Sequence, residues 1–260
     1  MSSLQLQSGL RVLVTAGASG IGRTIIEVLS SQGARVHTCD IDRDKLATFT
    51  ESFPDVSTSH TDVSDPKQVE ALFDDVRSSL GGLDVLINNA GISGPTAKLE
   101  DTDIDAWYRT IDVNLNSAFL CARLAIPLLR EGGRGRLINI SSVAGRLGYP
   151  HRSAYACSKW ALIGLTKSLA MELGPEGICV NAVLPGIVEG PRMREVIAAR
   201  SVSQKMDYSE VEQEYLNNIS LRRMVTACDV AAMVQFLCSP AGANISGQSL
   251  GVCGNVETLG

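Results

Sequence analysis

Short apolar runs alternate with longer amphipathic stretches along most of the chain, which is typical of strands that alternate with helices. Strands are predicted at Arg11–Thr15, Arg35–Asp40, Ser57–Val63, Leu83–Asn88, Arg136–Ile140, Ile178–Leu184 and Gln248–Val252. Helices are predicted at Ile21–Gln32, Asp42–Ser52, Pro66–Leu80, Ile104–Leu129 and Ser153–Leu173. The expected fold class is α/β, a Rossmann-type doubly wound parallel sheet of about seven strands with helices on both faces.

One segment departs from this alternation. Glu189–Val225 is polar, rich in arginine and helical in pattern, and it has no strand partner. Long insertions of this kind lie on the surface and are often lids. No low-complexity linker or change of composition divides the rest of the chain. We therefore expect residues 1–260 to form one domain, with 189–225 as a lid insertion.

Composition argues against several classes of partner and site. The net charge of −5 disfavours nucleic acid or an anionic membrane as the main partner. The first residues lack the pattern of a signal peptide, and no uninterrupted apolar run approaches the length of a membrane span. Seven scattered cysteines and three isolated histidines indicate free thiols in a reducing cytoplasm and no metal site.

The first predicted strand runs into a glycine-rich turn, Thr15–Gly22, that opens a helix. Small residues let the backbone approach a ligand, and the helix start offers N–H groups and a positive dipole end to a pyrophosphate. The strand–turn–helix context therefore predicts a dinucleotide site. Asp40 ends the second strand, where an acid binds ribose hydroxyls and repels a 2′-phosphate. We expect NAD rather than NADP, although Arg43 nearby could serve a phosphate.

Tyr155 and Lys159 stand four residues apart on a predicted helix, and Ser142 lies thirteen positions before the tyrosine. This spacing stacks the tyrosine and lysine on one helical face. An ammonium beside a phenol favours the phenolate, so the tyrosine can act as a base. Such pairs are common on helix surfaces, and the pair alone does not identify a catalytic site.

Further segments give the pair its context, in this order: Thr15–Gly22, Asp62–Val63, Asn88–Gly91, Asn114, Ile138–Ser142, Tyr155 with Lys159, and Asn181–Gly186. Over essentially its full length the chain resembles the short-chain dehydrogenase/reductase family. The resemblance implies that Tyr155 is the general acid/base and that Lys159 binds the nicotinamide ribose and favours the phenolate. It implies that Ser142 binds the substrate oxygen and that Asn114 holds a water linked to Lys159.

The resemblance also implies a cofactor site. Its residues are Gly17, Ser19, Gly20, Ile21, Gly22, Asp40, Asp62, Val63, Asn89, Ala90, Gly91, Tyr155, Lys159, Pro185, Gly186 and Val188. Two positions depart from the family pattern. Ala16 replaces the first glycine of the turn, so a positive φ there would cost free energy, and Gly17 is expected to absorb that demand. Gly190 replaces a threonine that often donates to the nicotinamide carboxamide.

The resemblance places the substrate pocket between Ile92–Pro95, Val143–Arg152 and the lid. The substrate candidates are Ser93, Arg146, Arg152 and Arg192. A guanidinium suits a carboxylate or phosphate, but arginines are also common on surface loops. The expected reaction is hydride transfer between NAD(H) and a secondary alcohol or ketone, with a polar or anionic hydroxy compound or a sugar as one interpretation of the arginines.

Two alternatives stay open. One is an NADPH enzyme similar to 3-oxoacyl-[acyl-carrier-protein] reductases, which Asp40 disfavours. The other is a catalytically silent nucleotide-sensing protein, which the intact set of Asn114, Ser142, Tyr155 and Lys159 disfavours. The resemblance further implies a homotetramer built on Ile104–Leu129 and Ser153–Leu173, and a dimer is also compatible with the sequence.

Overall fold

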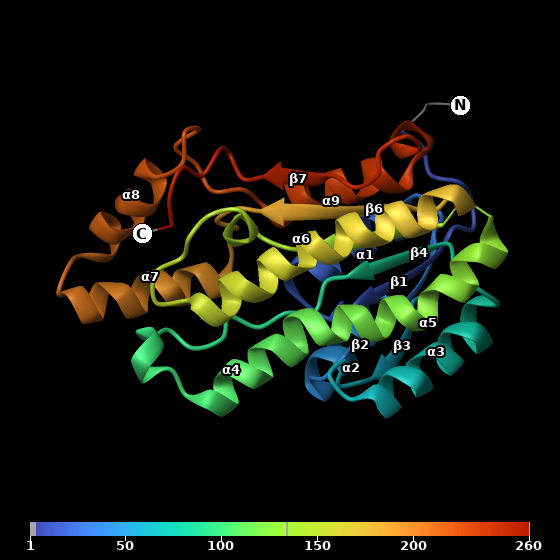
Figure 1. The fold of residues 1–260 in the computed structure, drawn as a ribbon, viewed down its shortest axis with the longest axis horizontal. Helices are drawn as coiled ribbons and strands as arrows, with labels where there is room; N and C mark the ends of the chain where they lie inside the picture. The colour runs from blue at the N-terminus through green and yellow to red at the C-terminus, as the bar shows by residue number, and fades with distance from the viewer. Residues whose placement is uncertain (1–3, 134, 260) are drawn as a thin grey trace.

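Seven parallel strands form one sheet in the order β3-β2-β1-β4-β5-β6-β7 (Figure 1). The computed structural model describes residues 4–133 and 135–259, without the side chains of residues 192, 199, 203 and 204. The strands are β1 (Arg11–Thr15), β2 (Arg35–Asp40), β3 (Ser57–His60), β4 (Val85–Asn88), β5 (Arg136–Ile140), β6 (Cys179–Pro185) and β7 (Ser249–Val252). The predicted fold class is confirmed.

Helices cover both faces of the sheet. One face carries α1 (Gly20–Ser31), α2 (Arg43–Ser52) and α9 (Ala227–Cys238), and the other carries α3 (Pro66–Leu80), α5 (Ser117–Gly132) and α6 (Ser153–Leu173). Strand β1 shows why both faces need cover, because Val12 and Val14 enter one apolar cluster and Leu13 enters the other. A strand buried on both sides reads as an apolar run, as β1 does, whereas β3 at the edge of the sheet has a polar sequence.

Helix α9 was not predicted. Its sequence is apolar on almost every side, so it lacks the polar stripe of an amphipathic helix. The start of this helix could have been predicted from a capping box. The Thr226 hydroxyl oxygen accepts from the backbone N–H of Asp229, and the Asp229 carboxylate accepts from the backbone N–H of Thr226. Two strands are also shorter than predicted. The third strand ends at His60 instead of Val63, and the fourth begins at Val85 instead of Leu83.

The segment Glu189–Val225 folds into two helices, α7 (Pro191–Gln204) and α8 (Tyr208–Asn217). They lie beyond the carboxyl ends of β6 and β7 (Figure 1). The two ends of the segment meet, because Val188 and Val225 form a parallel bridge and the N–H of Glu189 donates to the carbonyl of Val225 at 2.8 Å. The insertion is therefore anchored at its base beside β6.

The single helix predicted at Ile104–Leu129 is interrupted. A π-helical segment, Asp112–Asn116, separates α4 (Ile104–Ile111) from α5. It places Asn114 in the interior, where the side-chain oxygen accepts from the N–H of Ile92 at 2.7 Å. By length and composition alone Ile104–Gly132 could cross a membrane, but here α5 packs on β4, β5 and α3.

An ion pair joins β1 to the start of β4 at the end of the sheet opposite the glycine turn. Asp84 accepts from the backbone N–H and Nε of Arg11 at 2.9 Å and from its second guanidinium nitrogen at 2.7 Å. Partial burial of Asp84 opposes ionisation, but the hydrogen bonds from Arg11 outweigh it and hold the pKa of this carboxyl below its ordinary value.

We expect Asp84→Asn to lower the free energy of unfolding at neutral pH by about 1 kcal/mol, because it removes a charge-assisted pair. A depressed carboxyl pKa stabilises the fold above the unfolded-state pKa, and this contribution is lost as the pH falls through the folded-state value. The difference from wild type should therefore vanish in acid, as measured by urea unfolding across pH. Asp74→Asn, which breaks the exposed pair with Arg77, is the matched control. A difference that is independent of pH would contradict the assignment.

Candidate active site

The turn Thr15–Gly22 lies at the carboxyl end of β1, where the strand order reverses between β1 and β4. A Cβ on Gly22 would lie 2.5 Å from the carbonyl oxygen of Ala16, so only glycine lets the turn fold this tightly. No side chain caps the start of α1, and its first turn contains no acidic residue. The turn therefore presents backbone N–H groups and a positive helix end, which fit the pyrophosphate of a dinucleotide.

The expectation for Ala16 was wrong in one respect. Ala16 itself adopts a φ of 52°, and Gly17 has no positive φ. Gly17 instead permits close packing, since a Cβ there would lie 2.1 Å from the hydroxyl oxygen of Thr38. The strained alanine is held in place by its carbonyl, which accepts from the Asn89 side chain at 3.0 Å.

Hydrogen bonds join this turn to the end of β4. The Thr15 hydroxyl oxygen accepts from the backbone N–H groups of Asn89 and Ala90, both at 3.0 Å. The Asn89 amide in turn donates to the carbonyl of Thr15 at 2.9 Å. The predicted cofactor residues at Asn89–Gly91 are thus held directly against the glycine turn, and Thr15 is a contributor that the sequence interpretation did not assign.

Two acids mark the adenosine end of the expected cofactor site. Asp40 is 8% exposed and accepts from the N–H groups of Ala18 at 3.2 Å and Asp42 at 3.1 Å. Asp62 accepts from the N–H and hydroxyl of Ser64 at 2.9 and 2.6 Å and from Arg109 at 3.0 Å. Burial of Asp62 opposes ionisation, but these donors outweigh it and keep its pKa below the ordinary value. Val63 is buried beside it.

Arg109 was missed by sequence reasoning. It reaches from α4 to both Asp62 and Ser64, across 47 and 45 residues of sequence. No local pattern announces a pairing at such separation, and only the packing of α4 reveals it. Arg109 therefore fixes the orientation of the Asp62 carboxylate at the adenosine end.

Tyr155 and Lys159 both lie on α6, and Lys159 is 4% exposed. The ammonium nitrogen of Lys159 is 5.7 Å from the centre of the Tyr155 ring and donates to the carbonyl of Ile140 at 2.9 Å. A Cβ on Gly91 would lie 3.3 Å from that nitrogen and 3.4 Å from the side-chain oxygen of Asn114. The side chains of Lys159 and Asn114 therefore lie close to Gly91, in the loop that follows β4.

Ser142 follows β5 and begins a short 3₁₀ turn, Val143–Gly145, with its hydroxyl oxygen accepting from the N–H of Ala144 at 3.1 Å. This turn packs on α6, and the neighbouring Ser141 hydroxyl donates to the carbonyl of Lys159 at 2.8 Å. The structure therefore brings the four predicted catalytic residues to the carboxyl ends of the central strands and the helix beside them.

The residues expected at the nicotinamide end lie at the end of β6. The N–H of Gly186, which follows Pro185, donates to the carbonyl of Val252 at 2.9 Å, and a Cβ on this glycine would lie 2.7 Å from Cys253. Val188 forms the bridge at the base of the insertion, and Gly190 precedes α7. This arrangement leaves backbone groups, rather than a hydroxyl, beside the expected carboxamide.

Among the three substrate candidates whose side chains the structure describes, two lie together and one has a different partner. Arg152 donates to the carbonyl of Ser93 at 2.9 Å, so these two lie together beside Tyr155. Arg146 instead donates to the thiol sulfur of Cys253 at 3.2 Å. The side chain of Arg192 lies outside the described part of the structure. The arginines that can be located are bonded to the protein itself.

An apolar cluster lies beside the catalytic turn and under the insertion. Its buried members are Val143, Ile187, Ile219, Cys253 and Val256, and Leu147, Met193, Tyr215, Leu216, Met224 and Leu259 pack against them. Val143 directly follows the predicted catalytic serine, so this apolar surface borders the site.

A family model described as enoyl-(acyl carrier protein) reductase matches residues 15–255. The chain belongs to the short-chain dehydrogenase/reductase family. Among its relatives in this family is the granaticin polyketide synthase putative ketoacyl reductase 1 of Streptomyces violaceoruber. The two are 38% identical over 94% of this chain and 92% of that protein. As a family member the protein is an NAD(P)-dependent oxidoreductase.

Two further short-chain dehydrogenases/reductases bear on the cofactor. The 2-dehydro-3-deoxy-L-rhamnonate dehydrogenase (NAD(+)) of Sphingomonas sp. is 35% identical over 89% of each chain. The crystal structure of an actinorhodin polyketide ketoreductase variant with NADPH has a TM-score of 0.91 and 32% identity, covering 96% of this chain and 97% of that one. The family therefore supplies a nicotinamide cofactor without deciding between NAD and NADP.

We expect Tyr155→Phe to lower turnover by roughly 100- to 10,000-fold, the usual contribution of a general acid/base, because the phenyl ring cannot exchange a proton. Cofactor binding, measured by fluorescence titration with NADH, should persist because the turn at Thr15–Gly22 is untouched. Tyr108→Phe, at an exposed position on α4, is the matched control and should keep wild-type turnover. Substantial turnover by Tyr155→Phe would mean that the tyrosine has another role.

Proposed function

We propose that the protein transfers a hydride between NAD(H) and a secondary alcohol or ketone. The observation that carries this proposal is the meeting of Lys159, Asn114 and Gly91 next to Tyr155, with Asn89 of the same segment bonded to the pyrophosphate turn. The expected acid/base group, Tyr155, and the expected pyrophosphate-binding turn are thus joined through the loop Asn89–Gly91. A protein that only sensed nucleotides could use Lys159 to bind the nicotinamide ribose, but it would have no need of Tyr155 and Ser142 as well.

The chemistry at the substrate oxygen follows from these side chains. The nicotinamide, when bound, supplies the acceptor or donor of the hydride. In alcohol oxidation the Tyr155 phenolate removes the hydroxyl proton, and in ketone reduction the phenol returns it. The Ser142 hydroxyl donates a hydrogen bond to the same oxygen. The ammonium of Lys159 is expected to favour the phenolate. Asn114, which is bonded to Ile92, would hold a water that connects Lys159 to solvent.

NAD is the proposed cofactor. Asp40 is buried at the end of β2 and bonded to the N–H of Ala18, so its carboxylate is fixed where the adenosine ribose would lie. A 2′-phosphate there would meet a negative charge that the protein cannot move away. Neither the turn Ala16–Ser19 nor Ile41 after the acid supplies a positive charge, and Arg43 is exposed at the start of α2.

The substrate's body is proposed to be apolar, because the packed cluster that borders the expected pocket, around Val143 and Ile187 and against α7 and α8, consists of apolar side chains. Of the arginines expected to bind an acidic substrate, the two whose side chains the structure describes are bonded within the protein: Arg146 to Cys253 and Arg152 to Ser93. A second candidate, a ketoacyl reductase that uses NADPH, is favoured by the granaticin relative and by the NADPH complex of the actinorhodin ketoreductase.

We expect kcat/KM to be higher with NAD than with NADP, and higher for cyclic or aliphatic secondary alcohols than for hydroxy acids or sugars. The measurement is initial-rate kinetics on such a panel with both cofactors. A clear NADP preference would refute the cofactor assignment. Turnover restricted to hydroxy acids or sugars would refute the apolar substrate class, and cofactor binding without turnover on any substrate would refute the enzyme.

The Asp40→Ala variant tests the basis of the cofactor preference. Removing the carboxylate should lower the NAD/NADP ratio of kcat/KM by roughly tenfold or more, since one lost charge repulsion is worth over 1 kcal/mol at short range. Arg43→Ala is the control and should leave the ratio nearly unchanged. A ratio that Arg43→Ala shifts more than Asp40→Ala would contradict this account.

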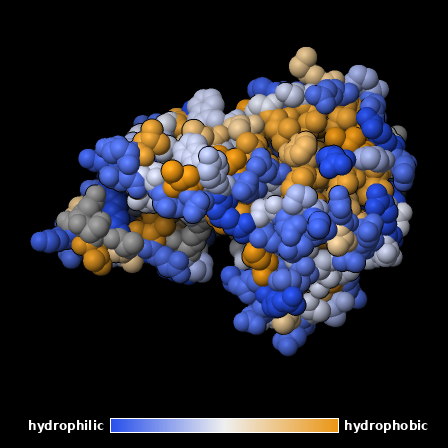
Figure 2. All heavy atoms as spheres, turned by 60° about the horizontal axis from the view of Figure 1, so that its bottom comes forward, coloured by the Kyte–Doolittle hydropathy of each residue, from blue (hydrophilic) through white to orange (hydrophobic). Residues whose placement is uncertain are grey.

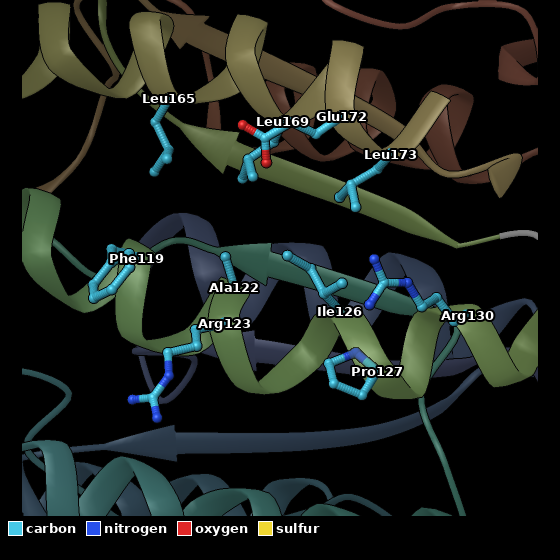
Figure 3. A pocket seen from close by; sticks show the side chains of 10 residues that line it. All are labelled: Phe119, Ala122, Arg123, Ile126, Pro127, Arg130, Leu165, Leu169, Glu172 and Leu173. Atoms are coloured by element: carbon cyan, nitrogen blue, oxygen red, sulfur yellow. The ribbon is translucent and has the colours of Figure 1, made fainter. Parts of the chain in front are cut away.

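We also propose that the chain assembles as a homotetramer through α5 and α6. Apolar atoms gather on the face over these helices (Figure 2), and a groove of about 380 Å³ runs between them. Leu165, Leu169 and Leu173 point from α6 toward α5 across this groove, with Phe119 at one end (Figure 3). Phe119 is 52% exposed, which is unusual for a phenylalanine on a helix of an isolated chain.

Phe119→Glu should therefore reduce the assembly to smaller species, because it places a charge in a dry contact. Sedimentation velocity reads the number of chains. Val202→Glu, at an exposed apolar position on α7, is the matched control and should sediment as wild type. A wild-type monomer, or a Phe119→Glu variant of unchanged mass, would overturn the proposal.

A cytoplasmic location is proposed on the state of the thiols. All seven cysteines are free, and burial raises the pKa of Cys39 and Cys238 to about 12. Thiols that ionise so reluctantly are inert, and free cysteines in this number suit a reducing compartment.

A further inference from the structure

A guanidinium lies beside the proposed catalytic tyrosine without belonging to the family's tetrad. Arg152 is the residue immediately before α6, and its central guanidinium carbon lies 5.5 Å from the centre of the Tyr155 ring. The same carbon lies 5.2 Å from the ring of Tyr149, and the two rings meet edge to face with their centres 6.5 Å apart. The guanidinium is thus shared between two aromatic rings.

Hydrogen bonds hold this arginine and its loop. One guanidinium nitrogen donates to the carbonyl of Ser93, and the N–H of Ala97 donates to the carbonyl of His151, both at 2.9 Å. The Nε of Arg152 is buried without a hydrogen-bond partner. The loop before α6 is therefore tied to the loop after β4, and the guanidinium is held chiefly by one carbonyl and two rings.

Two cations therefore flank Tyr155 at similar range. Lys159 lies 5.7 Å from the ring centre, one helical turn after the tyrosine, and Arg152 lies at nearly the same distance three residues before it. A cation over an aromatic face is attracted by the ring, and it stabilises any negative charge that the ring acquires. Tyr149 is the other titratable side chain against the guanidinium, and the loop after β4 contributes an uncharged carbonyl.

We propose that Arg152 is a positioning residue for proton transfer: with Lys159 it stabilises the phenolate of Tyr155, and its bond to Ser93 fixes the loop from which it acts. This inference rests on the proposed function, because it takes Tyr155 as the group that exchanges the proton. In this role Arg152 contacts Ser93 and Tyr155 of the protein itself and does not bind the acidic substrate that the sequence had suggested.

Two substitutions separate charge from hydrogen bonding. Arg152→Gln keeps an amide donor for Ser93 but removes the charge, whereas Arg152→Lys keeps the charge. In the glutamine variant, the pH at which alcohol oxidation reaches half of its plateau rate should rise by about one unit, the effect expected of one cation at this range. The lysine variant should recover most of that shift. Arg77→Gln removes an exposed charge on α3 and should leave the profile unchanged.

A second readout needs no turnover. Tyrosinate formation is followed by near-ultraviolet absorbance, and the difference between each protein and its Tyr155→Phe counterpart isolates Tyr155. The difference curve of Arg152→Gln should shift upward in pH by the same amount as the rate profile. If wild type turned over no alcohol at all, the proposed function would fail while this titration still decided the role of Arg152.

The proposal is overturned if the profiles of Arg152→Gln and wild type superimpose. It is equally overturned if Arg152→Gln only raises KM for acidic substrates, because Arg152 would then bind the substrate. Should the glutamine variant not fold, Tyr149→Leu removes one of the two rings that hold the guanidinium. That variant should show a smaller upward shift, and an unchanged profile would count against the inference.

Discussion

The link between Thr15 and Asn89 is the constraint on which the site depends. Parallel strands β1 and β4 end side by side at the point where the sheet order reverses, and their loops must part there to admit a ligand. A threonine hydroxyl and an asparagine amide bridge the opening with four hydrogen bonds to backbone groups. The bridge fixes the glycine turn, holds the carbonyl of the strained Ala16, and belongs to the same segment as Gly91, which lies beside Lys159.

Burial of a cation explains much of the remaining arrangement. Lys159 is almost fully enclosed, and an enclosed ammonium needs oxygen atoms or aromatic faces around it. The carbonyl of Ile140 supplies one such oxygen, and the Tyr155 ring supplies a face. The enclosed cation thereby ties the end of β5 to the Tyr155 side of α6. In the proposed function, one lysine serves both the binding of the cofactor and the chemistry at Tyr155.

The sequence predicted those parts of the molecule whose signals are local. Most buried strands read as apolar runs, the glycine turn followed a strand, and Tyr155 and Lys159 had helical spacing. The sheet and the placement of these two side chains on one helix could therefore be anticipated, while the catalytic roles stay predictions. Features produced by tertiary packing could not be anticipated. Arg109 meets Asp62 only because α4 folds back, and the need for glycine at position 17 comes from Thr38 of the next strand, which would clash with a Cβ there. The apolar helix α9 lacked an amphipathic stripe, and its capping box at Thr226 was overlooked.

The π-helical segment at Asp112–Asn116 makes chain length itself a determinant of the site. A π turn holds one residue more than an α turn, so it acts as a one-residue insertion that the helix accommodates by widening. Losing that residue would rotate everything beyond it by about 100° about the helix axis. Asn114 would then leave Ile92, and the face of α5 that borders the groove would turn toward another neighbour. Evolution can therefore exchange side chains along this helix far more freely than it can add or remove a position within it.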